Sequence, residues 1–298
     1  MGEPGSGGLS VLSRKLLSPL HAKTRQHLES TTPESPLQPA GERRNMLVVE
    51  GFSKEYENHR AVDSLSFRVQ EGEILGLVGP NGAGKTTTLR SIVGVLPIQE
   101  GRVLVAGHDL ATDEVAAKSR LAWIPDDPQP FDTLTVLEHL RFSAALYGVR
   151  DWQERADHLL ERFELTEKRT ALGGELSRGM RQKLAFCMAW IHTPALVLMD
   201  EPLSGLDPRA IRSAKDEIRG LARTGAAVVL SSHQLELIQE LADRILILDR
   251  GTKRFEGTLQ EARSTLSLGE DQDLEDIFLT ATDPGLPVGA SSVRPKAE

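Results

Sequence analysis

The first segment of this sequence with recognisable chemistry combines closely spaced glycines with one lysine and one hydroxyl residue. Residues 79–86 read Gly-Pro-Asn-Gly-Ala-Gly-Lys-Thr and fit the pattern G-x-x-x-x-G-K-[ST]. Glycines let backbone N–H groups converge on phosphate oxygens, and a following helix adds positive potential at its N-terminus. Lys85 would place a positive charge on the β- and γ-phosphates, and the Thr86 hydroxyl is a hard oxygen ligand suited to Mg²⁺. The predicted phosphate-binding residues are Gly79, Asn81, Gly82, Ala83, Gly84, Lys85, Thr86 and Thr87.

Two consecutive carboxylates follow a second apolar run. Residues 196–199 read Leu-Val-Leu-Met and lead directly into Asp200 and Glu201. At the carboxyl end of a buried strand these groups would lie at the sheet edge where ligands of α/β proteins bind. Asp200 would hold magnesium directly or through water. Glu201, directed to the other side because strand side chains alternate, would polarise a water for attack on the γ-phosphate. Taken alone, the pair also fits an acidic strand end facing solvent.

The elements that must position these groups follow an alternating pattern. Short apolar runs of strand length alternate with helical stretches, which favours an α/β core around a mainly parallel sheet. A helix over Lys85–Val95 is expected directly after the glycine-rich segment. The runs predicted as strands are residues 47–49, 74–78, 121–124, 196–199, 226–230 and 245–248.

Changes in composition divide the chain into three parts. Residues 1–45 contain five prolines and many small polar residues, which predicts a disordered extension. Residues 46–262 form the predicted α/β domain, with a helical insertion at about residues 131–178. Inside it, Thr135 and Glu138 have capping-box spacing, and a second helix is expected over Asp151–Phe163. Residues 263–298 form an acidic segment, with a helix fragment and a loose tail.

Overall composition excludes several classes of protein. The 298 residues carry a net charge of −8, which argues against nucleic acid as a partner. The single cysteine, Cys187, cannot form an intramolecular disulfide. The longest apolar run, Leu184–Ile191, is far below the roughly 18 residues that suggest a membrane span. No secretory signal is visible at the start of the chain.

Together with these motifs, further segments in the right order make residues 46–260 similar to the ATP-binding cassette (ABC) ATPases. Residues 176–180, Leu-Ser-Arg-Gly-Met, stand where that family carries Leu-Ser-Gly-Gly-Gln, and residues 204–207, Ser-Gly-Leu-Asp, resemble its D-loop. His233 resembles the switch histidine, and Tyr56 stands where an aromatic ring stacks on adenine. Val62 is a further residue expected to bind the nucleotide. The resemblance implies a P-loop NTPase (RecA-like) core with an antiparallel β N-terminal subdomain and an inserted α-helical subdomain.

The resemblance also implies that two cassettes sandwich two nucleotides in a head-to-tail dimer. Ser177 is a predicted N-cap of a helix over Arg178–Ile191, so its hydroxyl and nearby N–H groups form an anion site. In the family this site, with Gly179, faces the γ-phosphate held by the other subunit. Arg178 and Asp207 are expected at the dimer and coupling contacts. His233, with Glu201 and Lys85, is expected to act in catalysis.

Two positions depart from the family pattern. Arg178 and Met180 replace glycine and glutamine in the signature, a variant usual in the exporter branch called ABC-2. Asp126 follows the run 121–124 where most relatives have the Q-loop glutamine. Asp126 could ligate Mg²⁺ in its place, and Gln129 is a possible substitute.

The sequence therefore predicts the ATP-hydrolysing subunit of a transporter, most compatible with an exporter, using ATP and Mg²⁺. A separate transmembrane permease would dock near residues 126–140, with the chain peripheral on the cytoplasmic face of the membrane. The expected dimer is either a homodimer of this chain or a heterodimer with another cassette. The alternative is a soluble ABC ATPase acting on a non-membrane assembly. A P-loop kinase or GTPase is disfavoured because the signature, D-loop and switch histidine would have no role.

Overall fold

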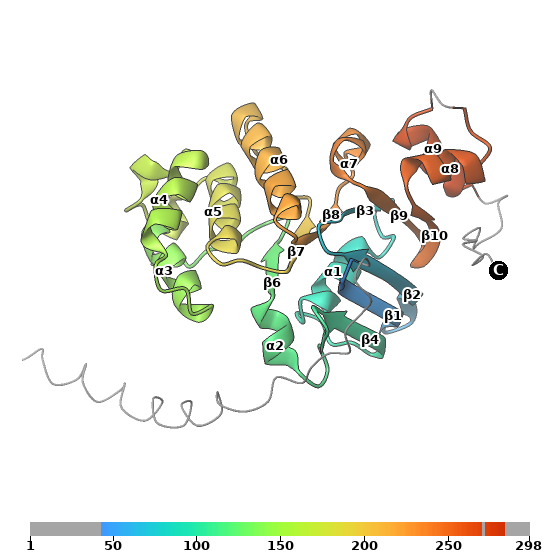
Figure 1. Ribbon diagram of the computed structural model, residues 1–298, viewed down its shortest axis with the longest axis horizontal. Coiled ribbons are helices and arrows are strands. Elements are labelled where there is room, and N and C mark those ends of the chain that lie inside the picture. The colour runs from blue at the N-terminus through green and yellow to red at the C-terminus, as the bar shows by residue number, and fades with distance from the viewer. Residues whose placement is uncertain (1–42, 270–271, 284–298) are drawn as a thin grey trace, which may run out of the picture. The chain divides into compact units, whose positions relative to one another are not determined.

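The computed structural model describes residues 43–269 and 272–283 (Figure 1). The predicted disordered extension, apart from residues 43–45, and the end of the predicted tail lie outside the described residues. Within the described ranges, every helix is too short or too polar to cross a lipid bilayer.

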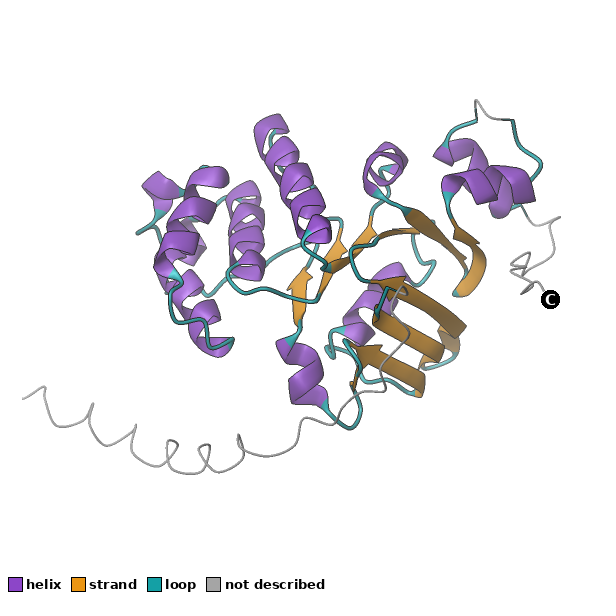
Figure 2. Ribbon diagram, viewed as in Figure 1, coloured by secondary structure: helices purple, strands orange, loops and turns teal. Residues whose placement is uncertain are grey.

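A six-stranded sheet forms the centre of the fold, in the order β10-β9-β3-β8-β7-β6 (Figure 2). Its strands pair in parallel except for β10, which is antiparallel to β9. Every residue of β3, β7 and β8 is buried, as expected for strands covered on both faces. The strands are β3 (Ile74–Val78), β6 (Leu121–Ile124), β7 (Leu196–Asp200), β8 (Ala227–Ser231), β9 (Arg244–Asp249) and β10 (Thr252–Gly257).

A second sheet, in the order β2-β1-β4-β5, is antiparallel throughout. Its long hairpin shares a hydrophobic core with the central sheet and with α1 (Lys85–Ile92), through residues such as Phe52, Leu75 and Leu89. The predicted antiparallel subdomain is therefore confirmed. The strands are β1 (Asn45–Tyr56), β2 (His59–Gln70), β4 (Glu100–Val105) and β5 (His108–Asp109), and α2 (Glu114–Ser119) follows them.

The other face of the central sheet is covered by helices that share a second core. This core joins β7 and β8 to α5 (Arg178–Trp190), α6 (Pro208–Arg223) and α7 (Leu235–Leu241). It continues into the inserted helices α3 (Val136–Leu146) and α4 (Gln153–Arg162), which lie beside α5 in Figure 1. Short 3₁₀ turns, η1 (Thr166–Lys168) and η2 (Gly173–Glu175), lead from α4 into α5.

Local signals in the sequence set several helix ends. Thr135 and Glu138 form the predicted capping box of α3, and the Ser177 hydroxyl accepts from the backbone N–H of Met180 at the start of α5. α1 ends at Ile92 and not at Val95, because Gly94 takes up the left-handed conformation with φ of 72°.

Two helices follow the central sheet, α8 (Leu259–Thr265) and α9 (Leu274–Ala281). Leu274 and Ile277 of α9 are buried in the same core as Leu237 of α7. The helix expected in this acidic segment is therefore present as α9. Its apolar face belongs to the second core, which α5, α6 and α7 form with the central sheet.

Candidate functional site

Four neighbouring strands end at one edge of the central sheet, and each leads into a segment with predicted chemistry. In sheet order, β3 leads to the glycine-rich loop, β8 to Ser231 and His233, β7 to Glu201, and β6 to Asp126. Ligands of open α/β sheets bind outside the carboxyl ends of parallel strands. The topology therefore gathers segments that are up to 150 residues apart in the chain, as between positions 81 and 231.

The loop between β3 and α1 fits a phosphate group. α1 has neither a side-chain cap nor an acidic residue in its first turn, so its first N–H groups have no competing anion. Gly84 has φ of 100°, and a Cβ there would lie 2.6 Å from the carbonyl oxygen of Ala61. At Gly79 a Cβ would lie 2.4 Å from the carbonyl oxygen of Leu248. Only glycine satisfies both positions.

The Lys85 ammonium lies inside this loop. Its Nζ donates to the carbonyl oxygens of Gly79 at 2.6 Å and Pro80 at 3.2 Å. Burial lowers the pKa of Lys85, and the nearby carboxylates of Glu201 and Asp200 oppose this shift. The lysine therefore lies in the phosphate loop, within electrostatic reach of the two predicted carboxylates.

The two carboxylates after β7 bind successive residues at the end of β8. Asp200 is 3% exposed and accepts a hydrogen bond from the Ser231 hydroxyl. Glu201 accepts from the Ser232 hydroxyl at 3.1 Å and from the backbone N–H of His233 at 2.8 Å. The ring Nδ1 of His233 lies 2.8 Å from Oε2 of Glu201, the carboxylate oxygen that also accepts from Ser232. Two hydrogen bonds and the nearby His233 ring thus fix the Glu201 side chain.

The backbone at Glu201 differs from simple strand alternation. β7 ends at Asp200, and Glu201 has φ of 47°, in the left-handed region. A residue with a Cβ pays strain there, and such strain is found at functional sites. The direction of the Glu201 side chain is therefore set by this turn and by its contacts with Ser232 and His233, and not by the pleat of β7.

The oxygen ligands at this edge of the sheet fit a magnesium ion only if phosphate oxygens of the nucleotide complete its coordination. Within residues 43–269 and 272–283 no group of three or more histidine, cysteine or acidic side chains could hold a metal by itself. Asp200 and the partly buried Thr86 provide hard oxygen atoms beside the phosphate loop. Magnesium in nucleotide sites is commonly held by one or two protein oxygens with phosphate oxygens and water.

Tyr56 and Val62, also predicted to bind the nucleotide, lie on either side of the β1–β2 turn. Tyr56, at the end of β1, is 41% exposed, and the Nζ of Lys54 lies 5.6 Å from its ring centroid. Val62 is fully buried, and its Cγ2 would be 3.0 Å from a Cβ at Gly84. Tyr56 is thus accessible for stacking, whereas Val62 supports the phosphate loop from behind.

The signature residues form the start of α5 and pack against the D-loop of the same chain. Ser177 caps α5 and is exposed, so the anion site predicted at this helix end is accessible. Gly179 lies so close to the D-loop that a Cβ would be 2.7 Å from the carbonyl oxygen of Gly205. Asp207 caps α6 and forms an ion pair with Lys183 at 2.9 Å, and these contacts lower its pKa to about 2.

The two departures from the family pattern contact each other. The Nη2 of Arg178 lies 3.5 Å from Oδ1 of Asp126 and 3.2 Å from the Ser204 hydroxyl. Gln129, predicted as a substitute for the Q-loop glutamine, donates to the carboxylate of Asp127 at 2.6 Å. Asp126 is thus engaged by a cation from α5 in this structure.

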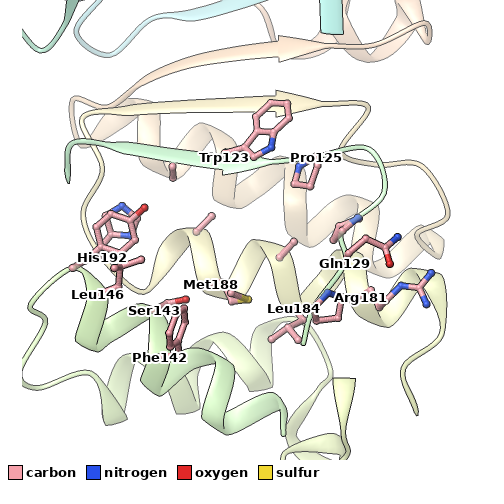
Figure 3. A pocket seen from close by; sticks show the side chains of 16 residues that line it. Trp123, Pro125, Gln129, Phe142, Ser143, Leu146, Arg181, Leu184, Met188 and His192 are labelled. Carbon is pink, nitrogen blue, oxygen red and sulfur yellow. The ribbon is translucent and has the colours of Figure 1, made fainter. Parts of the chain in front are cut away.

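A groove of about 280 Å³ lies between β6, α3 and α5 (Figure 3). Its floor and walls are mainly apolar and aromatic, and its polar members include Gln129, Ser143, Arg181 and His192. Phe142 and Leu146 of α3 are 46% and 68% exposed at its side. Its labelled lining residues are Trp123, Pro125, Gln129, Phe142, Ser143, Leu146, Arg181, Leu184, Met188 and His192.

Comparison with known proteins now decides the family. The family model described as ABC transporter matches residues 62–204. The ABC-type transporter ATP-binding protein EcsA of Bacillus subtilis (strain 168) is 32% identical over 240 residues, which cover 80% of this chain and 97% of EcsA. The chain belongs to the ABC transporter family.

Two further similarities support this membership of the ABC family. The SkfA peptide export ATP-binding protein SkfE of Bacillus subtilis (strain 168) is 36% identical, over 69% of this chain and 86% of SkfE. A solved ATP-binding subunit of an ABC transporter is 31% identical with a TM-score of 0.77, and the match covers 80% of this chain and 99% of that structure. The ABC ATPase fold and ATP hydrolysis by a transporter ATP-binding subunit are confirmed.

Several residues that contact this ABC site could not be predicted from the sequence pattern. Ser231 and Ser232 hold the two carboxylates, yet serines after an apolar run are too common to stand out. Gln182 and Lys183 look like ordinary polar positions of a helix, although both are buried. For Gln182 the spacing of four residues from Arg178 is a hint, because residues four apart share one face of a helix.

Proposed function

We propose that this chain is the ATP-binding subunit of an exporter and drives a separate transmembrane permease. Two such subunits, either two copies or this chain with another cassette, would sandwich two nucleotides between the phosphate loop of one and the Ser177 end of α5 of the other. The observation that carries the hydrolytic part is the convergence of Lys85, Asp200, Glu201 and His233 at one sheet edge.

In this proposal each residue at the sheet edge has one task. Lys85 and the N–H groups at the start of α1 bind the phosphates. Thr86 and Asp200 hold the magnesium ion, which would neutralise charge on the β- and γ-phosphates. Glu201 orients and deprotonates the attacking water, and His233 stabilises the charge at the γ-phosphate through its ring.

The groove between β6, α3 and α5 supports docking of a permease. Exposed large apolar side chains line it, Phe142 at 46% and Leu146 at 68%, and Phe131, at 56%, packs edge-on against Phe142. Clustered apolar patches of this kind mark interaction sites. We therefore place an amphipathic segment of the permease in this groove, which puts the chain on the cytoplasmic face of the membrane. SkfE, one of its relatives, is named for peptide export, which favours the outward direction.

The experiment that tests this proposal is capture of the tagged chain from detergent-solubilised native membranes, with partners identified by mass spectrometry. The expected partner is a multi-span membrane protein in stoichiometric amount. Leu146→Glu should reduce that capture at least severalfold. Val115→Glu is the matched control, since Val115 of α2 is 84% exposed outside the groove. A soluble partner would contradict the permease and favour action on a non-membrane assembly, whereas equal capture by both variants would contradict docking at the groove.

A further inference from the structure

Arg178 connects three segments that are distant in the sequence. Its Nη2 lies 3.5 Å from Asp126, in the loop of residues 125–135 after β6, and 3.2 Å from Ser204, in the loop of residues 201–207 after β7. Arg178 is itself the first residue of α5. One guanidinium thus joins the β6 loop, the β7 loop and the start of α5.

One helical turn later, Gln182 makes a second bridge between the same loops. Its Nε2 donates to the carbonyl oxygen of Pro202 at 2.9 Å and lies 3.5 Å from that of Pro125. Gln182 is fully buried, and the positions i and i+4 lie on one face of a helix. Two consecutive turns of α5 therefore each connect the β6 loop to the β7 loop.

The two bridges differ in how easily they open. Gln182 is buried and binds backbone carbonyls, so its bridge forms part of the core. The side chains of Arg178 and Asp126 are 52% and 51% exposed, so water can replace their contact. The Arg178 bridge is therefore the adjustable connection between the two loops.

Each loop connected in this way carries a different part of the machinery. Pro125, Pro128 and Gln129 of the β6 loop line the apolar groove. The β7 loop begins at Glu201, whose carboxylate is held by the end of β8. A contact between the loops therefore relates the position of the groove wall to the position of Glu201.

We propose that Asp126 and Arg178 act as one unit that positions the β7 loop, and with it Glu201, for hydrolysis. Asp126 serves as the partner of Arg178 and not as a ligand of the magnesium ion. Arg178, in place of the signature glycine, and Asp126, in place of the Q-loop glutamine, thus act as a matched pair of substitutions. This inference rests on the proposed role of Glu201 as the base, and it does not depend on the permease.

A double-mutant cycle on the purified full-length chain tests the pair. ATP hydrolysis is measured for wild type, Asp126→Asn, Arg178→Met and the double variant, with kcat and KM for ATP determined separately. Because the pair is half-exposed, we expect Asp126→Asn to lower kcat by about two- to fivefold, with little change in KM. In the Arg178→Met background the same substitution should have no further effect on kcat.

The neighbouring pair provides the matched control. Asp127 lies 3.7 Å from Arg181 on the same loop and helix, but its described contacts do not reach the β7 loop. Asp127→Asn should therefore leave kcat at the wild-type value. Melting temperatures establish that each variant is folded. If Arg178→Met does not fold, Arg178→Gln takes its place in the cycle, because it also removes the charge, and Asp126→Asn should again have no further effect on kcat.

Two results would overturn the inference. An equal loss from Asp126→Asn with and without Arg178 would mean that the residues act independently. An increase in the Mg²⁺ concentration needed for half-maximal rate in Asp126→Asn would assign Asp126 to the metal. Wild-type turnover in Glu201→Gln would instead remove the proposed base, and the coupling of Asp126 to Arg178 would still be measurable.

Discussion

The carboxylate of Glu201 is contacted twice by His233, by the backbone N–H and by the ring Nδ1, each at 2.8 Å. The backbone N–H donates to Oε1 of the carboxylate, and the ring Nδ1 lies beside Oε2. Glu201 follows β7 and His233 follows the neighbouring strand β8, and their contact fixes the orientation of both side chains. Loss of either should therefore disturb the position of the other.

Replacing Glu201 with Gln tests its role as the base. The amide keeps the size of the side chain but cannot accept a proton, so kcat should fall about 10²- to 10⁴-fold. ATP binding should be retained, and a closed dimer should accumulate in the presence of ATP. Steady-state phosphate release and size-exclusion chromatography measure the two effects. Glu236→Gln, on the exposed face of α7, is the control. Normal turnover in Glu201→Gln would show that another group activates the water.

Replacing Lys85 with Ala tests the phosphate site. Removal of a charged hydrogen-bond donor should weaken ATP binding by about 10- to 100-fold. Because Lys85 also binds the carbonyl oxygens of Gly79 and Pro80, a small loss of stability is expected as well. Fluorescence titration with a labelled nucleotide gives the affinity. Lys118→Ala, which removes a lysine paired with Glu114 on α2, should bind ATP normally. Unchanged affinity in Lys85→Ala would contradict the assigned role.

Two substitutions at Asp207 separate its capping role from its ion pair. Asp207→Ala removes the cap of α6, which costs about 1 to 2 kcal/mol of stability. Asp207→Asn keeps a capping oxygen and loses only the ion pair with Lys183, so its loss should be smaller. The pKa of Asp207 is lowered to about 2, so its stabilisation is complete above pH 3.8 and is lost as pH falls toward 2. Urea unfolding at pH 7 and pH 3 measures both effects. Equal stability of the two variants would argue against a capping role.

Sequence patterns predicted the parts of the site whose residues are contiguous. The phosphate loop, β3 and β6 were predicted with their bounds, because a glycine-rich turn and a fully buried strand have strong local signals. Only residues 47–49 of β1 were predicted, because its pairing with β2 has several register shifts and the alternation of side chains is broken there. β4 begins with three exposed residues and was not among the predicted strands, although residues 103–105 form an apolar run as long as residues 47–49.

Contacts between distant segments could not be predicted from local patterns. Asp200 and Ser231 are 31 residues apart, and Asp126 and Arg178 are 52 residues apart. Strand order in the central sheet brings the first pair together, and the packing of α5 against two loops brings the second pair together. Asp126 stood out in the sequence only as a missing glutamine, so its partner became visible only in the structure.

His192, at one end of the groove, should make stability depend on pH. Its ring stacks on Tyr147 with centroids 3.6 Å apart, and the residue is 6% exposed. Burial lowers the pKa of His192 to about 4. Neither ring nitrogen has a hydrogen bond of normal geometry within the described part of the chain, so the contact with the Leu121 carbonyl opposes the shift only weakly.

The sign of the effect follows from proton binding in the two states. Between pH 6.5 and pH 4 the unfolded chain binds a proton at this histidine and the folded chain does not, so acidification favours unfolding. The largest loss is about 3 kcal/mol, reached near pH 4. His192→Phe keeps a stacked ring and cannot titrate, so it should lose less stability than wild type between pH 7.5 and pH 4.5 in urea unfolding. Tyr147→Phe keeps the ring pair and the histidine, and it should retain the wild-type slope. If wild type and His192→Phe respond equally to pH, then His192 is protonated alike in both states and its burial has no energetic consequence for folding.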